Sequence, residues 1–302
     1  MFLYCNFGLM FLYKKIFNYF YTKIRNSYLF RNVTRNYNYK NFSILLPINH
    51  MFPDYQKAHS KYDKFLPIVS KYINQNEMII DIGANVGDTL AGMVDENPNP
   101  IYLCIEPEDE YYSYLLKNAD IIKKKIPNLK VHLLKQFVGN QISNISLDKK
   151  GGTAKANLIG GNIKSKTLDD ILNDFENIKK INLLKADTDG FDYDVLESAL
   201  KTIKKHKPIL FFECQYELEY QKTNYKNIIK TLQSLGYFHW TLFDNYGEKI
   251  ITTQNLETIY SLMEYVWKQN LGETKRTIFY YDLLVCCDNN KEIVDNIIKE
   301  IE

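Results

Sequence analysis

The sequence predicts an α/β protein built on a doubly wound, mostly parallel sheet of seven strands. From residue 54 onward, short apolar runs rich in β-branched residues alternate with segments of helical pattern. The segments between successive runs are long enough for the helical crossovers that parallel strands require. A glycine turn, Gly83 to Gly87, joins the first run to the next helix, as in doubly wound folds.

The composition is that of an ordinary globular chain. Its 302 residues are 45% hydrophobic and 25% charged, with a formal net charge of +2, so a sizeable core is available and nothing indicates a nucleic-acid binder. The five cysteines are odd in number and show no C-x-x-C spacing, which argues against a disulfide framework or a structural zinc site. A reducing compartment follows, and we expect a cytoplasmic protein.

The first 53 residues differ from the rest, since they contain seven basic residues, no acid and many Phe and Tyr. The uncharged opening run is shorter than the roughly 20 residues of a spanning helix. The basic residues follow this run, whereas a secretory signal would place them before it. We expect residues 1–44 to form a helical extension that packs on a main domain, 45–302, or is poorly ordered. Peripheral contact with an anionic membrane surface is the alternative.

The elements of the main domain are predicted in chain order. A helical segment, 59–73, is interrupted near Pro67, and residues 145–158 indicate a hairpin that turns at Gly151-Gly152. Thr167 to Asp170 form a capping box that begins a short helix. The predicted strands are 78–82, 101–106, 130–138, 181–187, 208–214, 237–244 and 277–286. The other predicted helices are 88–96, 108–125, one ending near 205, 221–235, one between the last two strands, and one at the C-terminus.

The glycine turn fits neither common phosphate-binding pattern. A dinucleotide site would need G-x-G-x-x-G, but Asn85 and Asp88 stand where the second and third glycines belong. A P-loop would need Gly-Lys-Ser/Thr from residue 88, where Asp88 and Thr89 stand. Asp81, at the end of the strand, would also repel a pyrophosphate.

Acids on both sides of the turn suit another ligand. Glu106 ends the next strand, where this fold meets a ribose, and its carboxylate can accept hydrogen bonds from both ribose hydroxyls. Its alternative role is to cap the helix near Pro107. Asp81 suits an ammonium group. S-adenosylmethionine is such a ligand, a cationic nucleoside without a phosphate chain. The residues expected to bind it are Asp81, Gly83, Ala84, Asn85, Gly87, Asp88, Thr89, Glu106 and Pro107.

The motif D-I-G-A-N-V-G-D-T, with I-E-P-E downstream, resembles the cofactor motifs of S-adenosylmethionine-dependent methyltransferases. The later T-L-D-D-I-L, L-L-K-A-D-T-D-G-F-D-Y-D-V-L-E-S-A and P-I-L-F-F-E-C are similar to the FkbM family, in one consistent order over roughly residues 45–287. The resemblance implies a Rossmann-like methyltransferase fold with a reversed last strand, and methylation of a hydroxyl in a sugar, glycan or related natural product. The family often has Glu where Asp189 stands, which leaves the role of Asp189 open.

Three acids are the candidate catalytic residues. Asp187, Asp189 and Glu213 follow or end strands near the centre of the predicted sheet, and open α/β sheets bind ligands beyond those ends. Asp187 is the first candidate for the base that takes the hydroxyl proton during methyl transfer, and Glu213 is the second. Asp189 has a helix N-cap as its alternative role. His50 and His59 in the segment before the first strand are further candidate bases, and no residue cluster predicts a metal site.

Two other functions stay open. Asp187 and Glu213 could supply the acids of the Lys-Asp-Lys-Glu set of a ribose 2′-O-methyltransferase acting on RNA, although no lysines match. The second alternative is a non-catalytic, cofactor-binding module whose N-terminal segment docks a glycan-synthesis partner or a membrane.

Overall fold

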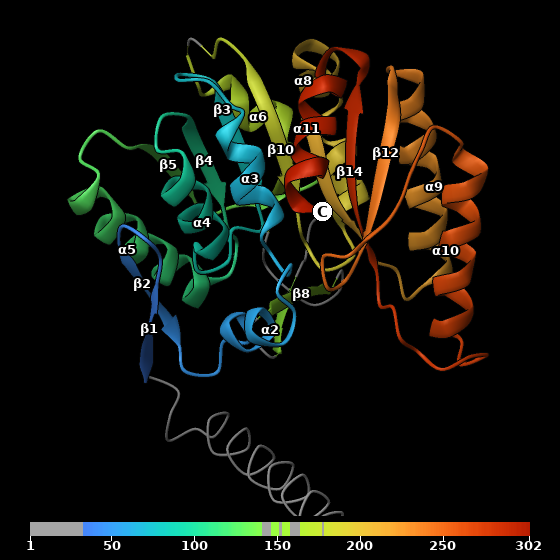
Figure 1. Cartoon of the computed structure of the whole chain (residues 1–302), viewed down its shortest axis with the longest axis horizontal. Coiled ribbons are helices and arrows are strands. Elements are labelled where there is room, and N and C mark those ends of the chain that lie inside the picture. The colour runs from blue at the N-terminus through green and yellow to red at the C-terminus, as the bar shows by residue number, and fades with distance from the viewer. Residues whose placement is uncertain (1–32, 141–145, 151–152, 158–163, 177) are drawn as a thin grey trace, which may run out of the picture.

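The computed structural model describes residues 33–140, 146–150, 153–157, 164–176 and 178–302. Its centre is an eight-stranded sheet in the order β13-β12-β14-β11-β10-β3-β4-β5 (Figure 1). The strands are β3 (Met78–Ile82), β4 (Ile101–Ile105), β5 (Lys130–Leu134), β10 (Ile181–Ala186), β11 (Ile209–Cys214), β12 (Tyr237–Asp244), β13 (Lys249–Thr253) and β14 (Tyr281–Cys287). The predicted doubly wound α/β fold is confirmed.

Strand direction divides this sheet into two parts. Strands β5, β4, β3, β10 and β11 are parallel, while β14 lies antiparallel between β11 and β12. This is the reversed last strand that the resemblance implied. The order of the strands changes direction between β3 and β10, and ligands bind beyond the carboxyl ends of strands at such a point. The topology therefore indicates a site beyond Ile82 and Ala186.

The sheet has one strand more than the seven predicted. Strand β13 pairs antiparallel with β12 at the edge of the sheet. Its side chains alternate between half-buried and exposed. An edge strand of this kind lacks the continuous apolar run by which buried strands are recognised in a sequence. The prediction missed it for this reason.

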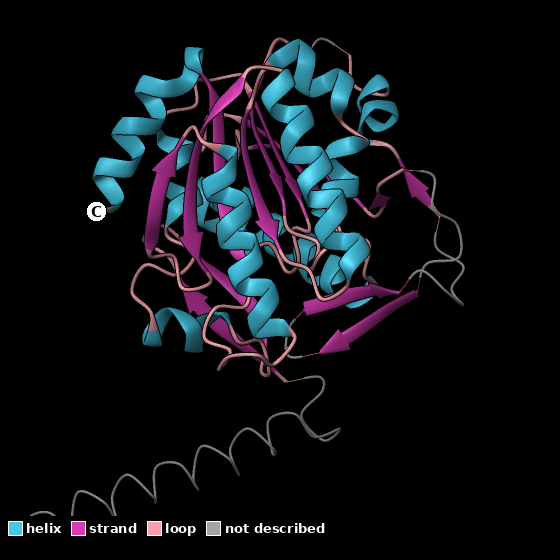
Figure 2. Cartoon of the chain, turned by 90° about the vertical axis from the view of Figure 1, so that its right-hand side faces the viewer, coloured by secondary structure: helices cyan, strands magenta, loops and turns pink. Residues whose placement is uncertain are grey.

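Helices cover both faces of the sheet, as Figure 2 shows. One face packs against α3 (Phe65–Lys71), α4 (Asp88–Glu96), α5 (Asp109–Lys125) and α11 (Lys291–Ile301). The other face packs against α6 (Leu168–Asn173), α7 (Asp192–Glu197), α8 (Leu200–His206), α9 (Glu219–Ser234) and α10 (Leu256–Asn270). Consecutive strand residues such as Ile79 and Ile80 are buried in opposite clusters, because side chains alternate across a strand.

A hairpin that the sequence did not predict precedes the sheet. Strand β1 (Thr34–Asn38) pairs antiparallel with β2 (Ser43–Pro47). The Leu45 N–H donates to Asn118 Oδ1 on α5 at 2.8 Å, and Asn118 Nδ2 donates to the Leu45 carbonyl at 2.9 Å. Strand β2 crosses the expected domain boundary at 44/45, and Ile44 and Leu46 are fully buried. A helical extension was predicted over 1–44. Residues 1–32 lie outside the described residues, and the prediction is wrong for 33–44, which contain β1 and the start of β2.

The helix predicted over 59–73 is wrong in its bounds. Helix α2 (Phe52–Ala58) ends before it, and turns at 60–63 separate α2 from α3. Pro67 is the third residue of α3, where it causes no interruption because first-turn N–H groups have no intrahelical partner.

Other local predictions fare better. Thr167 caps α6, where its hydroxyl accepts from the Asp170 N–H at 3.1 Å and donates to the Asp170 carboxylate at 2.7 Å. The predicted hairpin is confirmed by the antiparallel pair β7 (Ser146–Lys150) and β8 (Thr153–Asn157), although its turn lies outside the described residues. The strand predicted over 130–138 ends at Leu134, and a separate β6 (Phe137–Val138) pairs with β9 (Ser165–Lys166).

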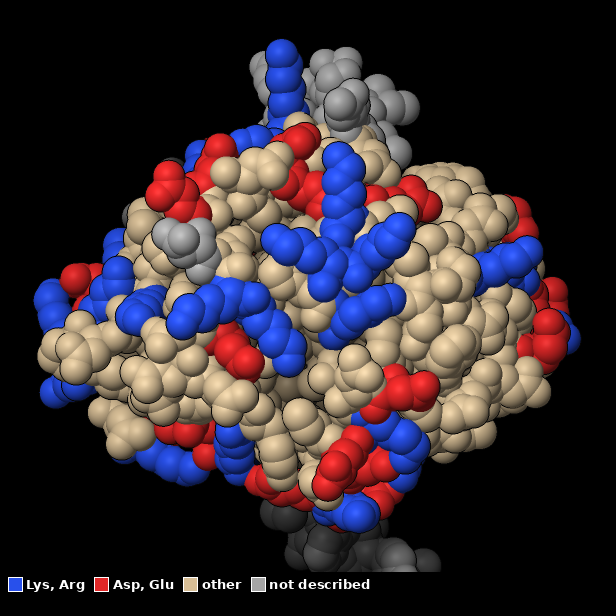
Figure 3. All heavy atoms as spheres, turned by 90° about the horizontal axis from the view of Figure 1, so that it is seen from above, with Lys and Arg blue, Asp and Glu red and all other residues tan. Residues whose placement is uncertain are grey.

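Charge is unevenly distributed over the surface. Seen from the end of the molecule at which α8 lies, Lys and Arg side chains gather near the middle of the surface (Figure 3). The last turn of α8 contributes Lys204, Lys205 and His206 to this end. Helix α2 lies at the opposite end (Figure 1). In the part of the chain that the structure describes, no helix is long and apolar enough to cross a membrane, and Cys104, Cys214, Cys286 and Cys287 are buried, free thiols.

Candidate active site

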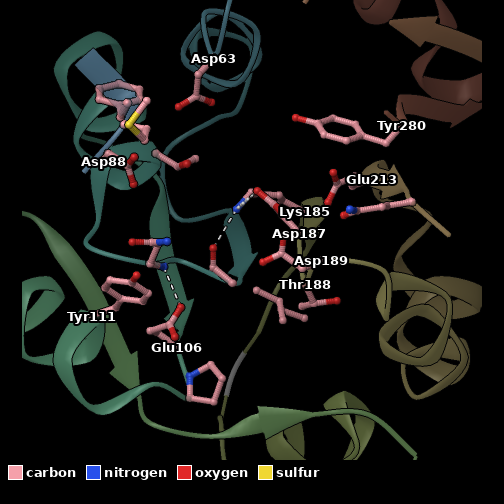
Figure 4. A pocket seen from close by; sticks show the side chains of 18 of the residues that line it. Asp63, Asp88, Glu106, Tyr111, Lys185, Asp187, Thr188, Asp189, Glu213 and Tyr280 are labelled. Carbon is pink, nitrogen blue, oxygen red and sulfur yellow. Dashed lines mark hydrogen bonds and ion pairs between the residues drawn. The ribbon is translucent and has the colours of Figure 1, made fainter. Parts of the chain in front are cut away.

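A cavity of about 420 Å³ lies beyond the carboxyl ends of β3, β4, β10 and β11, beside α2. It occupies the place that the strand order indicated. Figure 4 shows its walls, with Glu106 and Tyr111 on one side, Glu213 and Tyr280 on the other, and Asp187 between them. Nine predicted site residues line the cavity: Gly83, Asn85, Asp88, Thr89, Glu106, Pro107, Asp187, Asp189 and Glu213. The other three, Asp81, Ala84 and Gly87, do not line it.

The glycine turn brings two segments of chain into close contact. Gly83 has a φ of +76°, and a Cβ built on it would lie 1.8 Å from the carbonyl oxygen of Asp187. Only glycine therefore allows the end of β3 to lie against the chain leaving β10. Gly87, with a φ of +85°, is the N-cap of α4, so the first turn of that helix, including Asp88 and Thr89, faces the cavity.

Glu106 holds the turn in place from the neighbouring strand. Its Oε2 accepts from the Asn85 N–H and its Oε1 from the Glu108 N–H, both at 2.8 Å. Burial raises the pKa of Glu106 to about 7, and these two hydrogen bonds oppose the shift. Glu106 does not cap the following helix, because the N-cap of α5 is Glu108, whose carboxylate accepts from the Tyr111 N–H at 2.8 Å.

Lys185 is a buried cation at the centre of the site. It was not among the residues predicted from the sequence. Its Nζ lies 2.8 Å from Asp81 Oδ1, 3.1 Å from the Gly83 carbonyl and 3.4 Å from Asp187 Oδ2. Burial alone would lower the pKa of Lys185, but Asp81 and Asp187 raise it well above its usual value. Asp81, predicted to meet an ammonium group of the cofactor, thus meets the ammonium of Lys185.

The three candidate catalytic acids have different surroundings. The side chain of Asp187 is half-exposed and lies beside Lys185. Glu213 is only 5% exposed, and burial, followed by the nearby charge of Asp187, raises its pKa well above the usual range. Asp189 lies in the left-handed region with a φ of +52°. It is not a helix cap, because α7 has Phe191 as its N-cap residue.

Only one of the two candidate histidines lies in the wall of the cavity. His50 lines the cavity, where its Nδ1 accepts from the Phe52 N–H at 3.4 Å and its Nε2 lies 3.2 Å from Asn85 Oδ1. Both ring nitrogens are therefore engaged, Nε2 with the glycine turn and Nδ1 with the first residue of α2. His59 does not line the cavity; its ring stacks on Tyr246 at a centroid distance of 4.0 Å.

The family model of the methyltransferase FkbM domain matches residues 81–238, which begin at Asp81 and include the glycine turn, Glu106, Lys185, Asp187 and Glu213.

The chain belongs to the FkbM methyltransferase family.

Solved structures show distant similarity to this FkbM protein. A methyltransferase FkbM from Methylobacillus flagellatus KT has 18% identity over 67% of this chain and 50% of its own, with a TM-score of 0.44. The plantazolicin methyltransferase BpumL in complex with SAH has 9% identity over 78% and 89% of the two chains, with a TM-score of 0.39. The precorrin-6y C5,15-methyltransferase from Geobacter metallireducens GS-15 has 9% identity over 74% and 86%, with a TM-score of 0.38. The chain spans about half the length of the first of these. No curated protein matches it.

S-adenosylmethionine is the cofactor of this FkbM domain, and the cavity suits it chemically. Each Glu106 oxygen accepts one backbone hydrogen bond and retains a further lone pair for a ribose hydroxyl. The cofactor is cationic, and the acids Asp88, Asp187 and Asp189 line the cavity beside a single, already paired lysine. The first turn of α4 would hold the carboxylate of the cofactor.

Several residues of the site were not predicted from the FkbM sequence. Lys185 lies inside an apolar run, so its role is evident only once β10 pairs with β3 and places it opposite Asp81. Asp63 in the turn before α3 and Tyr280 immediately before β14 also line the cavity, yet neither belongs to a recognisable motif. Asp282 in β14 lies directly opposite Glu213, and only the strand register reveals this neighbour.

Proposed function

We propose that this FkbM protein transfers a methyl group from S-adenosylmethionine to a hydroxyl oxygen of a sugar, glycan or related natural product. The observation that carries the proposal is the position of the Asp187 carboxylate. It lies between the Glu106 side of the cavity, which suits the nucleoside, and the Glu213 side, which is left for the acceptor (Figure 4).

The bound cofactor supplies an electrophilic methyl group, and the residues of the chain supply alignment and a place for the proton. An alcohol loses its proton only as its oxygen begins to bond, so a carboxylate within reach is required. The Asp187 side chain is half-exposed and lies 3.4 Å from Lys185 Nζ, so an acceptor hydroxyl can reach it. Glu213 is buried, and this burial raises its pKa and favours the protonated form. Asp187 is thus the proposed base, and Glu213 is a group that contacts the acceptor.

The acidic lining argues against RNA as the acceptor. Asp63, Asp187, Asp189 and Glu213 face the cavity, and they would repel a phosphate backbone. The lysines near α8 lie at the far end of the molecule, so a polyanion bound there would not reach Asp187 (Figures 1 and 3). Lys185 is committed to Asp81 and is 3% exposed, so it is not free to bind a phosphate.

The base assignment is tested with Asp187→Asn. A panel of hexoses, amino hexoses and polyketide alcohols is first screened for release of S-adenosylhomocysteine. With an accepted alcohol, Asp187→Asn should lower kcat by about 10²–10⁴-fold, while the cofactor Kd in calorimetry stays unchanged. Asp120→Asn, a charge change on the exposed face of α5, should retain wild-type turnover.

Two results would contradict the proposal. Full turnover by Asp187→Asn would remove Asp187 from the role of base. Cofactor binding without transfer to any alcohol of the panel would favour the alternative of a non-catalytic module.

A further inference from the structure

A side cavity of about 70 Å³ opens beside the main one, toward β14. The two cavities share Asp63, Asp187 and Glu213 in their walls. The remaining wall is largely aromatic, with Phe211 and Phe243 from the sheet. A liquid water occupies about 30 Å³, so this space suits one small group of a larger molecule rather than a sugar ring.

Four carboxyl groups border this side cavity, and one of them, Asp187, is paired with Lys185. Ala186 pairs with Phe212, so the residues that follow, Asp187 and Glu213, continue the same row of side chains. Glu213 in turn lies directly opposite Asp282 on the antiparallel neighbour β14. Asp63 approaches from the turn before α3, where its backbone has a φ of +55°. Like charges directly opposite on neighbouring strands destabilise a sheet. The side cavity therefore brings together Asp63, Glu213 and Asp282 at a cost in stability.

These three carboxyls have no partner within the described chain. No hydrogen bond or ion pair joins their oxygens to a described residue, and Glu213 is 5% exposed. The two lysines in the same walls are occupied: Lys185 by Asp81 and Asp187, and Lys61 by Glu248 at 2.8 Å. A buried carboxyl without a partner is unfavourable, so the arrangement calls for a cation from outside the chain.

The chemistry of the walls selects the kind of cation. An ammonium group has three N–H donors, which matches three carboxyl acceptors, and the aromatic side chains of Tyr62 and Tyr280 lie in the same wall. Among the described residues, no three His, Cys, Asp or Glu side chains are close enough together to hold a metal ion. Burial is the main cause that raises the pKa of Asp63, Glu213 and Asp282 well above the usual range, and a cation beside them would reverse this shift.

We propose that the side cavity binds a protonated primary amine of the acceptor. The acceptor is then an alcohol that also carries an amine, such as an amino sugar, and its hydroxyl faces Asp187 while its ammonium lies among Asp63, Glu213 and Asp282. This inference rests on the proposed O-methyl transfer and narrows its substrate class.

Calorimetric titration tests the amine site without turnover. Glucosamine, glucose and N-acetylglucosamine are titrated into the protein in the presence of S-adenosylhomocysteine. Glucosamine should bind about ten-fold or more tightly than either neutral sugar, the gain expected from hydrogen bonds to charged groups. Asp282→Asn should remove this preference, whereas Asp120→Asn on the exposed face of α5 should keep it. Thermal unfolding confirms that both variants are folded.

The inference is overturned by equal affinity for the three sugars, by no detectable binding of glucosamine, or by a preference that survives in both Asp282→Asn and Glu213→Gln. Methyl transfer to the same sugars, followed by mass spectrometry, separates this inference from the proposed function. Glucose methylated as efficiently as glucosamine would overturn the amine site and leave O-methylation standing. A glucosamine preference without O-methylation of any sugar would do the reverse, and an N-methylated product would overturn both.

Discussion

At the β4 end of the cavity, each oxygen of the Glu106 carboxyl receives a backbone N–H, whereas at the β14 end the carboxyls of Glu213 and Asp282 receive no partner from the described chain. Both ends are formed from acids at the ends of neighbouring strands. The difference is that the acid at the β4 end is hydrogen-bonded within the chain even before a ligand binds. The β14 end leaves its charge to be satisfied by a guest, as expected where a fold gives up stability for function.

The largest expected effect comes from a substitution in the glycine turn, which Glu106 holds at the β4 end of the cavity. Gly83→Ala would place a Cβ 1.8 Å from the Asp187 carbonyl, against backbone that cannot move aside easily. We expect a loss of about 5 kcal/mol or failure to fold, measured by chemical denaturation. The matched control is Gly272→Ala, which has a similar φ of +80° but nothing within 4 Å of the added Cβ. Its cost should be only the left-handed backbone, about 1–2 kcal/mol. Equal losses would show that the contact with Asp187 is unimportant.

The next largest effect is expected on removing Lys185, which lies between the two ends of the cavity and pairs with Asp81. Lys185→Met leaves Asp81 buried at 0% exposure without its counter-ion, and loss of one partner of a buried pair costs about 3–5 kcal/mol. The double variant Lys185→Met with Asp81→Asn should recover much of this loss, because no buried charge remains. Urea denaturation of the two single variants and the double variant gives the coupling energy. Additive losses would contradict the pairing.

The smallest expected effect is a pH dependence of stability that arises from Glu106 at the β4 end. The pKa of Glu106 is about 7 in the folded chain and near 4.5 in the unfolded one, so between these values the folded state binds the extra proton. The stability that this proton confers is present below pH 4.5 and is lost as pH rises through 7, an expected loss of about 3 kcal/mol. Wild type should therefore lose stability relative to Glu106→Gln across this range. A pH-independent difference between the two proteins would contradict the shift.

Sequence reasoning located the β4 end better than the β14 end. The glycine turn and Glu106 occupy fixed positions in a local strand–turn–helix–strand unit, so their spacing alone placed them together. Lys185 and Asp81 are far apart in the sequence, and a lysine in an apolar run has no local signature of an ion pair. Asp282 faces Glu213 only because β14 inserts beside β11, and Asp63 approaches from a turn where a helix had been expected.

The same contrast holds for the fold. The central strands were predicted because they are buried on both faces and read as apolar runs. The polar strand β1 and the half-exposed β13 lack such runs. Strand β1 pairs with β2, which is hydrogen-bonded to α5, and β13 pairs with β12. The interior of the sheet could therefore be predicted from local sequence patterns. Its edges and the Glu213 side of the cavity could not, because they depend on contacts between residues far apart in the sequence.

The place of β14 has a consequence for how the protein is made. Strand β14 lies between β11 and β12, both of which leave the ribosome before it. Until it arrives, the facing edges of those two strands expose unpaired N–H and C=O groups, and such edges promote aggregation. Asp282 arrives with the same strand, so the cavity cannot present its full set of acids to an acceptor before the sheet is closed. The strand that closes the sheet therefore also supplies one of the acids of the proposed amine site.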